Sequence, residues 1–219
     1  MKSVLISTRP KWCEKICHKI SKDQNGKPIY EKRIEVRKSA PSEVPFKAYI
    51  YATKPKKFCK CGAMSTSDEL LWLANGKVEM GDGFKFWADG DEYQCLNGRI
   101  IGEFICDKVY NLVNAFGGIM FADENLNQLE PQLFRDMSCL TDEQTADYLG
   151  DKDGYGWHIS DLKIYDRPRE LSEFYKPCPT KEKGDCLSCD CLADNDYGGI
   201  CTNNLTRPPQ SWQYVEELK

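Results

Sequence analysis

The chain has 219 residues, of which 41% are hydrophobic and 29% are charged, a composition typical of a globular protein that can bury a full core. No apolar stretch is long enough to span a membrane and residues 1–6 lack the apolar run of a signal peptide, which argues against a membrane protein and predicts a cytoplasmic one. The formal net charge is −4, yet residues 1–60 contain sixteen Lys or Arg against five Asp or Glu, while residues 61–219 contain fourteen against twenty-nine.

The basic N-terminal part can attract phosphate groups even though the whole protein is acidic, because exposed charges act over about 8 to 10 Å. Nucleic acid is therefore the first partner to consider. The alternative is a solvated lysine-rich surface that the acidic remainder of the chain balances. Charge alone leaves both interpretations open.

The first predicted elements are a strand at residues 3–7 and a helix that starts at Thr8-Arg9-Pro10 and runs to about Ile20. Thr8 suits the N-cap and Pro10 suits the first turn. A helical spacing of apolar residues predicts a core-facing side for this helix. That side consists of Trp12, Cys13, Ile16, Cys17 and Ile20.

A turn at residues 23–26 precedes two predicted strands, Ile29 to Lys38 and Phe46 to Thr53. From Lys54 to Gly98 the pattern loosens into a stretch rich in Gly and Asp. We interpret this stretch as an insertion, with a short helical patch near residues 68–73 and a hairpin around residues 84–87.

Regular structure resumes at residues 98–107, a predicted strand whose glycines indicate bending, as in a small barrel. A helix follows at residues 141–149, because Thr141 and Gln144 have the spacing of a capping box. Residues 155–165 alternate as a core strand. This strand-rich order favours a closed or nearly closed sheet with few helices.

Five of the twelve cysteines fall within 24 residues near the C-terminus. Without a secretory signal, such a cluster favours metal-bound thiols over a disulfide framework. A Cys-x2-Cys turn supplies two ligands of a tetrahedral zinc site, and flanking cysteines complete the set. We predict a structural zinc ion held by Cys178, Cys186, Cys189 and Cys201, with Cys191 as a substitute.

Five separated segments carry a family resemblance. They are residues 4–12, 32–37, 98–107, 154–160 and 207–212, with the sequences VLISTRPKW, KRIEVR, GRIIGEFICD, GYGWHIS and RPPQSW. Together they resemble the ASCH-domain proteins of bacterial genomes and their prophages, over most of the chain except residues 54–95.

This resemblance implies an α+β fold, a small PUA-like β-barrel with flanking helices of the kind that binds RNA. The barrel would occupy residues 1–176 with the insertion at about 54–98. A cysteine-rich zinc loop would follow at 177–206, and residues 207–219 would supply the closing strand of the barrel.

In the family the barrel's cleft carries a strand of the type Lys-Thr-x-x-x-Arg. Lys32 matches its lysine and Arg37 its arginine, while Arg33 replaces the threonine with a third cation. Trp12 or Trp157 would stack on an unpaired base, although core packing is the alternative for both. The predicted RNA-binding residues are Lys11, Lys32, Arg33, Arg37 and Lys38.

Some small ASCH relatives hydrolyse N4-acetylcytidine with a lysine of this strand, a hydroxyl and a later glutamate. The resemblance makes Lys32 the candidate lysine, and Glu35 stands in place of the hydroxyl. Alternatively, Glu35 pairs with Arg37 or accepts a hydrogen bond from the exocyclic amine of a bound base. A third interpretation is a prophage module that binds another protein through the insertion.

His158 lies near Ser160 and Asp161 and could act as a general base. No nucleophile elbow accompanies it, so we expect an ordinary core or surface histidine.

Overall fold

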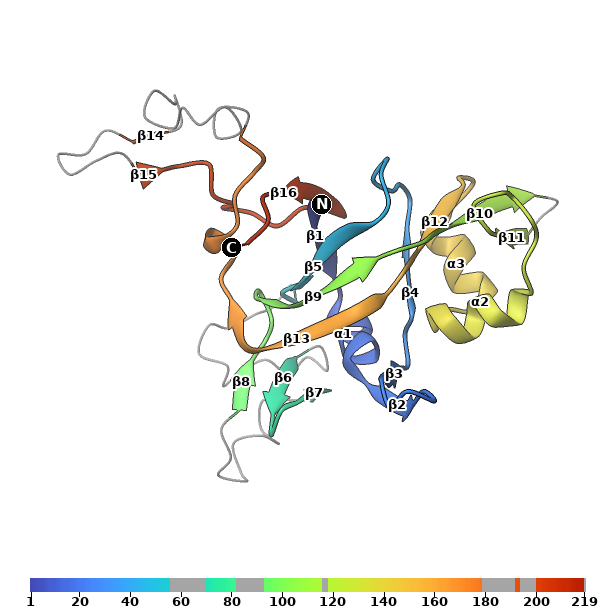
Figure 1. Ribbon diagram of the computed structural model, residues 1–219, viewed down its shortest axis with the longest axis horizontal. Coiled ribbons are helices and arrows are strands. Elements are labelled where there is room, and N and C mark those ends of the chain that lie inside the picture. The colour runs from blue at the N-terminus through green and yellow to red at the C-terminus, as the bar shows by residue number, and fades with distance from the viewer. Residues whose placement is uncertain (56–69, 82–92, 116–117, 179–191, 194–199, 219) are drawn as a thin grey trace.

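The computed structural model describes residues 1–55, 70–81, 93–115, 118–178, 192–193 and 200–218. The protein is an α+β protein made mostly of sheet, with three α-helices in this part of the chain (Figure 1). No helix there is both long and apolar enough to cross a membrane.

The largest sheet has five strands in the order β13-β9-β5-β1-β16. Its inner strands β1 and β5 are parallel, and the other neighbours are antiparallel. The predicted strands at 3–7 and 46–53 are thereby confirmed. The strands are β1 (Lys2–Thr8), β5 (Phe46–Ala52), β9 (Ile100–Cys106), β13 (Ser160–Arg169) and β16 (Trp212–Val215).

A second sheet has four strands in the order β11-β10-β12-β4. The chain enters it from β9 through Asp107 and Lys108, and leaves it for β13 through Ile159 alone. His158 Nδ1 lies 2.6 Å from Asp107 Oδ1, so this contact links the two connections between the sheets. The strands are β4 (Ile34–Arg37), β10 (Val109–Ala115), β11 (Gly118–Ala122) and β12 (Gly154–His158).

The predicted closed barrel is not confirmed. Within the described ranges both sheets keep two free edges, β13 and β16 in one and β11 and β4 in the other. Edge strand β4 is joined to the first sheet by a side chain, because Arg37 donates hydrogen bonds to the carbonyl oxygen of Ser7 at the end of β1. In the first sheet, Gly102 on β9 packs closely against the edge strand β13, where an added Cβ would lie 2.4 Å from the carbonyl oxygen of Lys163.

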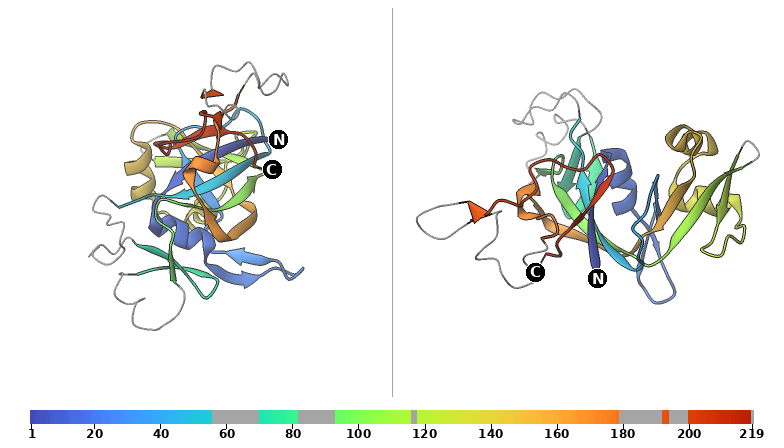
Figure 2. Two further views of the ribbon diagram at one scale, coloured as in Figure 1. Left: turned by 90° about the vertical axis from the view of Figure 1, so that its left-hand side faces the viewer. Right: turned by 90° about the horizontal axis from the view of Figure 1, so that it is seen from above.

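The first helix, α1 (Pro10–Cys17), is shorter than predicted and begins one residue later. Arg9 is its N-cap, because Thr8 belongs to β1. Ile20 lies in β2 and is 54% exposed, so its placement on the helix was wrong. The physical reason is that β2 (Lys19–Lys22) pairs with β3 (Pro28–Tyr30) in a hairpin that projects from the molecule (Figure 2).

The other two helices lie together at the end of the molecule that carries β10 and β11 (Figure 1, Figure 2). The predicted capping box of Thr141 and Gln144 is present at α3 (Asp142–Leu149). Sequence reasoning missed α2 (Pro131–Ser138), although Pro131 at its start and the buried pair Phe134 and Met137 are the signals of a short helix.

The strand predicted at 29–38 is two strands, β3 and β4. Between them the backbone of Lys32 donates to Lys15 and that of Arg33 donates to Met137, so neither residue pairs in a sheet. The remaining short elements in the described chain are η1 (Leu171–Glu173), β14 (Leu192–Ala193) and β15 (Ile200–Cys201).

The insertion forms a three-stranded sheet in the order β7-β6-β8 where it is described. Residues 71–73 belong to a strand, so the predicted helical patch was wrong there, because this segment pairs with β7 on one side and with β8 on the other. The predicted hairpin at 84–87 lies outside the described residues. The strands are β6 (Leu71–Ala74), β7 (Lys77–Met80) and β8 (Tyr93–Cys95).

The main core lies between the five-stranded sheet, α1 and β12. Trp157 is fully buried there and packs edge-on against Phe46 and Trp212, with ring centroids 4.9 and 5.7 Å away. Core packing, the alternative to base stacking, therefore describes Trp157.

Candidate functional site

A buried charged cluster lies where four distant segments meet. We define the Lys32 cluster as Lys32, Glu35 and Arg37; each of the three is 6% exposed or less. The surrounding groups come from the end of β1, from α1, from the end of α2 and from the segment before β16. Three of the five segments that resemble the ASCH family contribute to this one place.

Arg37 closes one side of the cluster with hydrogen bonds to backbone carbonyl groups. Its Nη1 donates to Ser7 O at 3.0 Å and to Ser211 O at 3.2 Å, and its Nη2 donates to Thr8 Oγ1 at 3.1 Å. Nη2 also lies 2.7 Å from Glu35 Oε1. A buried guanidinium needs such acceptors, because desolvation otherwise disfavours its charge.

Glu35 is the only carboxylate that forms an ion pair with Lys32 or Arg37 among the described residues. Its Oε2 lies 3.5 Å from Lys32 Nζ, too far for a good hydrogen bond, and has no hydrogen-bond partner. Buried polar atoms usually have a hydrogen-bond partner, so this carboxylate oxygen is a candidate acceptor for a donor from a ligand.

Lys32 contacts α1, and its ammonium group lies inside the protein. Nζ donates to the carbonyl oxygen of Ser138 at 2.7 Å and lies 5.2 Å from the centre of the Trp12 ring. Burial lowers the pKa of Lys32 below its ordinary 10.5, although the Glu35 carboxylate opposes that shift. The amine is therefore more easily deprotonated than an ordinary lysine.

Trp12 is partly exposed, and the ammonium group of a second lysine lies against its ring. Lys11 Nζ lies 5.0 Å from the ring centre, and Lys11 is exposed. The ring thus has one buried and one exposed cation against it, each within cation–π range. The helical pattern placed Trp12 on the side that faces the core, but the side chain is partly exposed.

The five predicted RNA-binding residues divide by exposure. Lys11 and Lys38 are exposed, and Lys38 lies 5.5 Å from the ring centre of Tyr148 on α3. Arg33 is partly buried. Lys32 and Arg37 are buried and bonded to protein acceptors, which differs from the predicted strand with its cations at the mouth of a cleft. The local pattern of charges could not reveal this difference, because the acceptors come from distant segments.

His158 is a surface residue rather than part of a nucleophile site. Its Nδ1 contacts Asp107, and its side chain is 25% exposed. The hydroxyl group of Ser160 instead donates to Ile105 O at 2.8 Å. The histidine therefore links the two connections between the sheets, and this agrees with the expected ordinary histidine.

The zinc hypothesis depends on cysteines that mostly lie outside the described residues. These are Cys186, Cys189 and Cys191. Cys178 is buried, and Cys201 lies in β15. Among the residues that the structure describes, no three His, Cys, Asp or Glu side chains are grouped as metal ligands. The zinc site stays a prediction.

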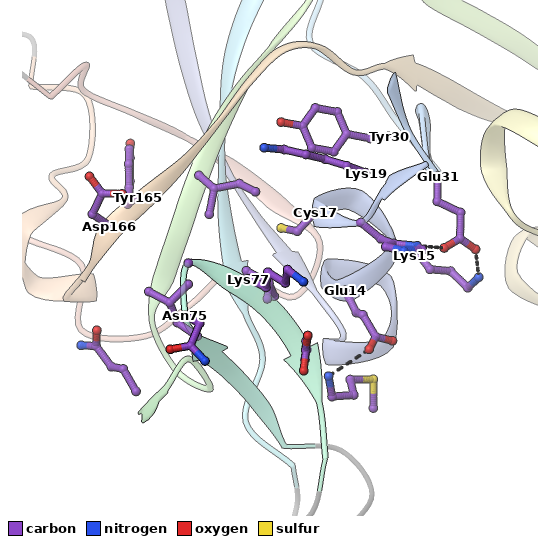
Figure 3. Close-up of a pocket in the computed structure, with 18 of the residues that line it drawn as sticks. Glu14, Lys15, Cys17, Lys19, Tyr30, Glu31, Asn75, Lys77, Tyr165 and Asp166 are labelled. Atoms are coloured by element: carbon purple, nitrogen blue, oxygen red, sulfur yellow. Dashed lines mark hydrogen bonds and ion pairs between the residues drawn. The ribbon is translucent and has the colours of Figure 1, made fainter. Parts of the chain in front are cut away.

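A large cleft lies apart from the Lys32 cluster. Its volume is about 1520 Å³, and its walls come from α1, the β2–β3 hairpin, the insertion sheet and β13 (Figure 3). Sequence reasoning missed this cleft, because its walls come from segments that are far apart in the chain, from α1 through the insertion to residues 164–166 of β13.

No family model and no curated protein matches the chain. The chain is similar in structure to the ASCH protein of Zymomonas mobilis, with 14% identity and a TM-score of 0.44 over 99% of this chain and 89% of that one. A serine-to-alanine variant of that protein gives 15% identity and a TM-score of 0.46, with coverages of 99% and 89%. A tyrosine-to-phenylalanine variant gives 13% and 0.44, with coverages of 99% and 92%. At TM-scores below 0.5 these likenesses do not by themselves establish a family.

Proposed function

We propose that this protein is an RNA-binding module of the ASCH type, with the PUA-like character that its sequence motifs imply. The observation that carries the proposal is the Lys32 cluster, where segments from four parts of the chain surround a buried carboxylate that has one oxygen without a hydrogen-bond partner. Burying three charges costs several kcal/mol per ion unless each is well compensated. An incompletely compensated cluster is more typical of a binding site than of a stabilising core.

The phosphate contacts in this proposal belong to Lys11 and Lys38. Both are exposed, and their known contacts are with aromatic rings rather than carboxylates, so their charges are available to an anion. Arg33 is partly exposed between them in sequence. Lys32 and Arg37 act indirectly, by holding Glu35 in place.

The base contact in this proposal belongs to Glu35 and Trp12. Glu35 Oε2 can accept a hydrogen bond from the exocyclic amine of an unpaired base, as the sequence already suggested. The base would enter beside Trp12, whose ring is the partly exposed group over the cluster and can stack on a nucleobase. Adenine and cytosine carry such amines, whereas uracil does not.

The test is a fluorescence anisotropy titration of a 12-nucleotide labelled single-stranded RNA at two salt concentrations. Phosphate contacts predict weaker binding at higher salt, and loss of two contacts in Lys11→Ala/Lys38→Ala should reduce the salt slope by about 1.4. Lys108→Ala/Lys152→Ala removes the same charge from exposed positions elsewhere and serves as the control. Absence of binding at both salt concentrations would contradict the proposal.

A second candidate function is hydrolysis of an acetylated nucleoside such as N4-acetylcytidine, as some small ASCH relatives perform it. The observation that favours it is the position of the Lys32 amine, which is buried 3.5 Å from the Glu35 carboxylate and whose pKa burial lowers. A deprotonated amine next to a carboxylate can activate a nucleophile. Glu35 is the carboxylate paired with Lys32 in the described chain, and no residue is assigned here to the later glutamate of those relatives.

This candidate is tested by incubating the protein with N4-acetylcytidine and separating cytidine and acetate by chromatography. Release of both products that is lost in Lys32→Met and in Glu35→Gln would support hydrolysis. No release by a folded wild-type protein would leave the RNA-binding module as the function of the cluster.

A further inference from the structure

The large cleft has room for a segment of a polymer. Its volume of about 1520 Å³ exceeds the roughly 300 to 1,000 Å³ of sites that enclose one small molecule. Its walls are the β2–β3 hairpin and α1 on one side, and the insertion sheet and β13 on the other (Figure 3). A segment of several residues or nucleotides fits between them.

Two of the acidic groups at the cleft are already engaged by the protein. The carboxylate of Glu14 accepts a hydrogen bond from the backbone of Met80 at 2.9 Å. Glu31 pairs with Lys15 and with His18, and these contacts hold its pKa below its ordinary value despite partial burial. The Glu31 charge is therefore balanced by Lys15, whereas Glu14 keeps its negative charge and only its position is fixed.

Two lysines at the cleft have no such engagement. Lys19 on β2 and Lys77 on β7 are exposed, lie on opposite walls, and make no ion pair with any residue that the structure describes. The exposed carboxylates Glu79 and Asp166 also line the cleft, so its charge is mixed. An anionic polymer would consequently place its charges at Lys19 and Lys77 rather than along the whole cleft.

Two tyrosine rings complement these lysines. Tyr30 lies directly across the hairpin from Lys19, and the two side chains are neighbours in Figure 3. Tyr165 lines the opposite wall and donates a hydrogen bond from its hydroxyl to Glu103 at 2.6 Å, which fixes its ring. Proteins commonly bind single-stranded nucleic acid by stacking unpaired bases on aromatic rings and contacting the phosphates with nearby cations.

We infer that this cleft binds single-stranded RNA, with phosphates at Lys19 and Lys77 and a base against Tyr30. This inference rests on the proposed RNA-binding function and adds a second contact surface, distinct from the Lys32 cluster. RNA is favoured over an acidic peptide because a peptide would not use the tyrosine rings for stacking.

The experiment compares Lys19→Ala/Lys77→Ala with Lys22→Ala/Lys152→Ala in the same anisotropy titration of a 12-nucleotide single-stranded RNA. Lys22 lies on the same strand as Lys19 and is exposed, but it does not line the cleft. The cleft variant should bind roughly tenfold more weakly, with a salt slope reduced by about 1.4. The control should change much less, and Tyr30→Ala should weaken binding at least about fivefold.

The outcomes separate this inference from the function on which it rests. Equal affinity of the cleft variant and its control, with binding by the wild-type protein intact, would overturn the cleft and leave the RNA-binding module standing. No RNA binding by the wild-type protein would overturn both. Binding of a labelled polyglutamate peptide that requires Lys19 and Lys77, without RNA binding, would assign the cleft to an acidic peptide instead. Circular dichroism of each variant verifies its fold.

Discussion

The hairpin β2–β3 and the segment of residues 32–37, which ends with strand β4, follow one another in the chain and are both rich in cations, yet their cations differ in environment. Lys19, Lys22 and Lys27 on the hairpin side are exposed. Lys32 and Arg37 are buried and bonded to protein oxygen atoms. The hairpin cations can contact an anionic partner directly, whereas Lys32 and Arg37 contact groups inside the protein.

A count of positive charges in a sequence therefore does not distinguish buried cations from exposed ones. A buried cation is held by acceptors that the fold brings from far away. The Ser138 acceptor of Lys32 is 106 residues distant and the Ser211 acceptor of Arg37 is 174 residues distant. An exposed cation has no such requirement, and its charge acts on solvent and partners.

The largest effect is expected for Arg37→Ala. Truncation leaves the Glu35 carboxylate without its 2.7 Å partner and removes the donors to Ser7 and Ser211, so unfolding should become easier by about 3 to 5 kcal/mol. Urea unfolding followed by circular dichroism measures this. Lys22→Ala, on the hairpin, should change the free energy of unfolding by less than about 0.5 kcal/mol. Similar losses in the two variants would remove the contrast between the regions.

A smaller effect with a distinct pH dependence is expected for Lys32→Met. The loss of the donor to Ser138 should cost about 1 to 3 kcal/mol at neutral pH. Because the folded-state pKa of Lys32 is lowered, the unfolded chain binds more protons there up to the ordinary 10.5. Stability from this group therefore rises with pH through that window, by no more than about 1.4 kcal/mol per pH unit.

The measurement for this variant is urea unfolding at several values between pH 7 and pH 10. The gap between wild-type protein and Lys32→Met should widen as the pH rises, since only the wild-type protein has the amine. A gap that stays constant would mean that Lys32 keeps an ordinary pKa in the fold.

A modest effect is expected for Glu31→Gln, at the junction of the two regions. Contacts with Lys15 and His18 lower the pKa of Glu31, so its contribution is present above the ordinary 4.5 and is lost as the pH falls through the lower folded-state value. For this partly exposed group we expect about 0.5 to 1 kcal/mol at pH 7. Urea midpoints at pH 7 and pH 3 measure the difference, and an equal difference at both pH values would contradict the prediction.

The smallest effect is expected for Lys27→Ala at the far end of the hairpin. Its ammonium lies 3.9 Å from Asp161, and both side chains are more than 70% exposed. Such a pair contributes about 0.3 kcal/mol or less, and added salt screens it. A loss above 1 kcal/mol in thermal or urea unfolding would show that the hairpin contributes more to the fold than its exposure indicates.

Local signals in the sequence predicted local structure well. The capping box of Thr141 and Gln144 identified α3, and alternation identified β1 and β5. The same signals failed where the chain forms contacts with distant segments. The pattern through Ile20 continued as a helix, but pairing of β2 with β3 ends α1 at Cys17.

The site could be predicted only in outline. The sequence identified Lys32, Glu35, Arg37 and Trp12 as residues of interest, but their mutual contacts depend on long-range pairing that no local pattern encodes. The acceptors Ser138 and Ser211 carry no signal of their own, since a backbone carbonyl group is the same in every residue.

The most direct test of this account is lysine acetylation footprinting of the protein with and without single-stranded RNA, with mass spectrometry to quantify each site. We predict that Lys11 and Lys38 react in the free protein and become protected by RNA, whereas the buried Lys32 stays unreactive in both samples. Ready acetylation of Lys32 in the folded free protein, or RNA binding that leaves Lys11 and Lys38 unprotected, would contradict it.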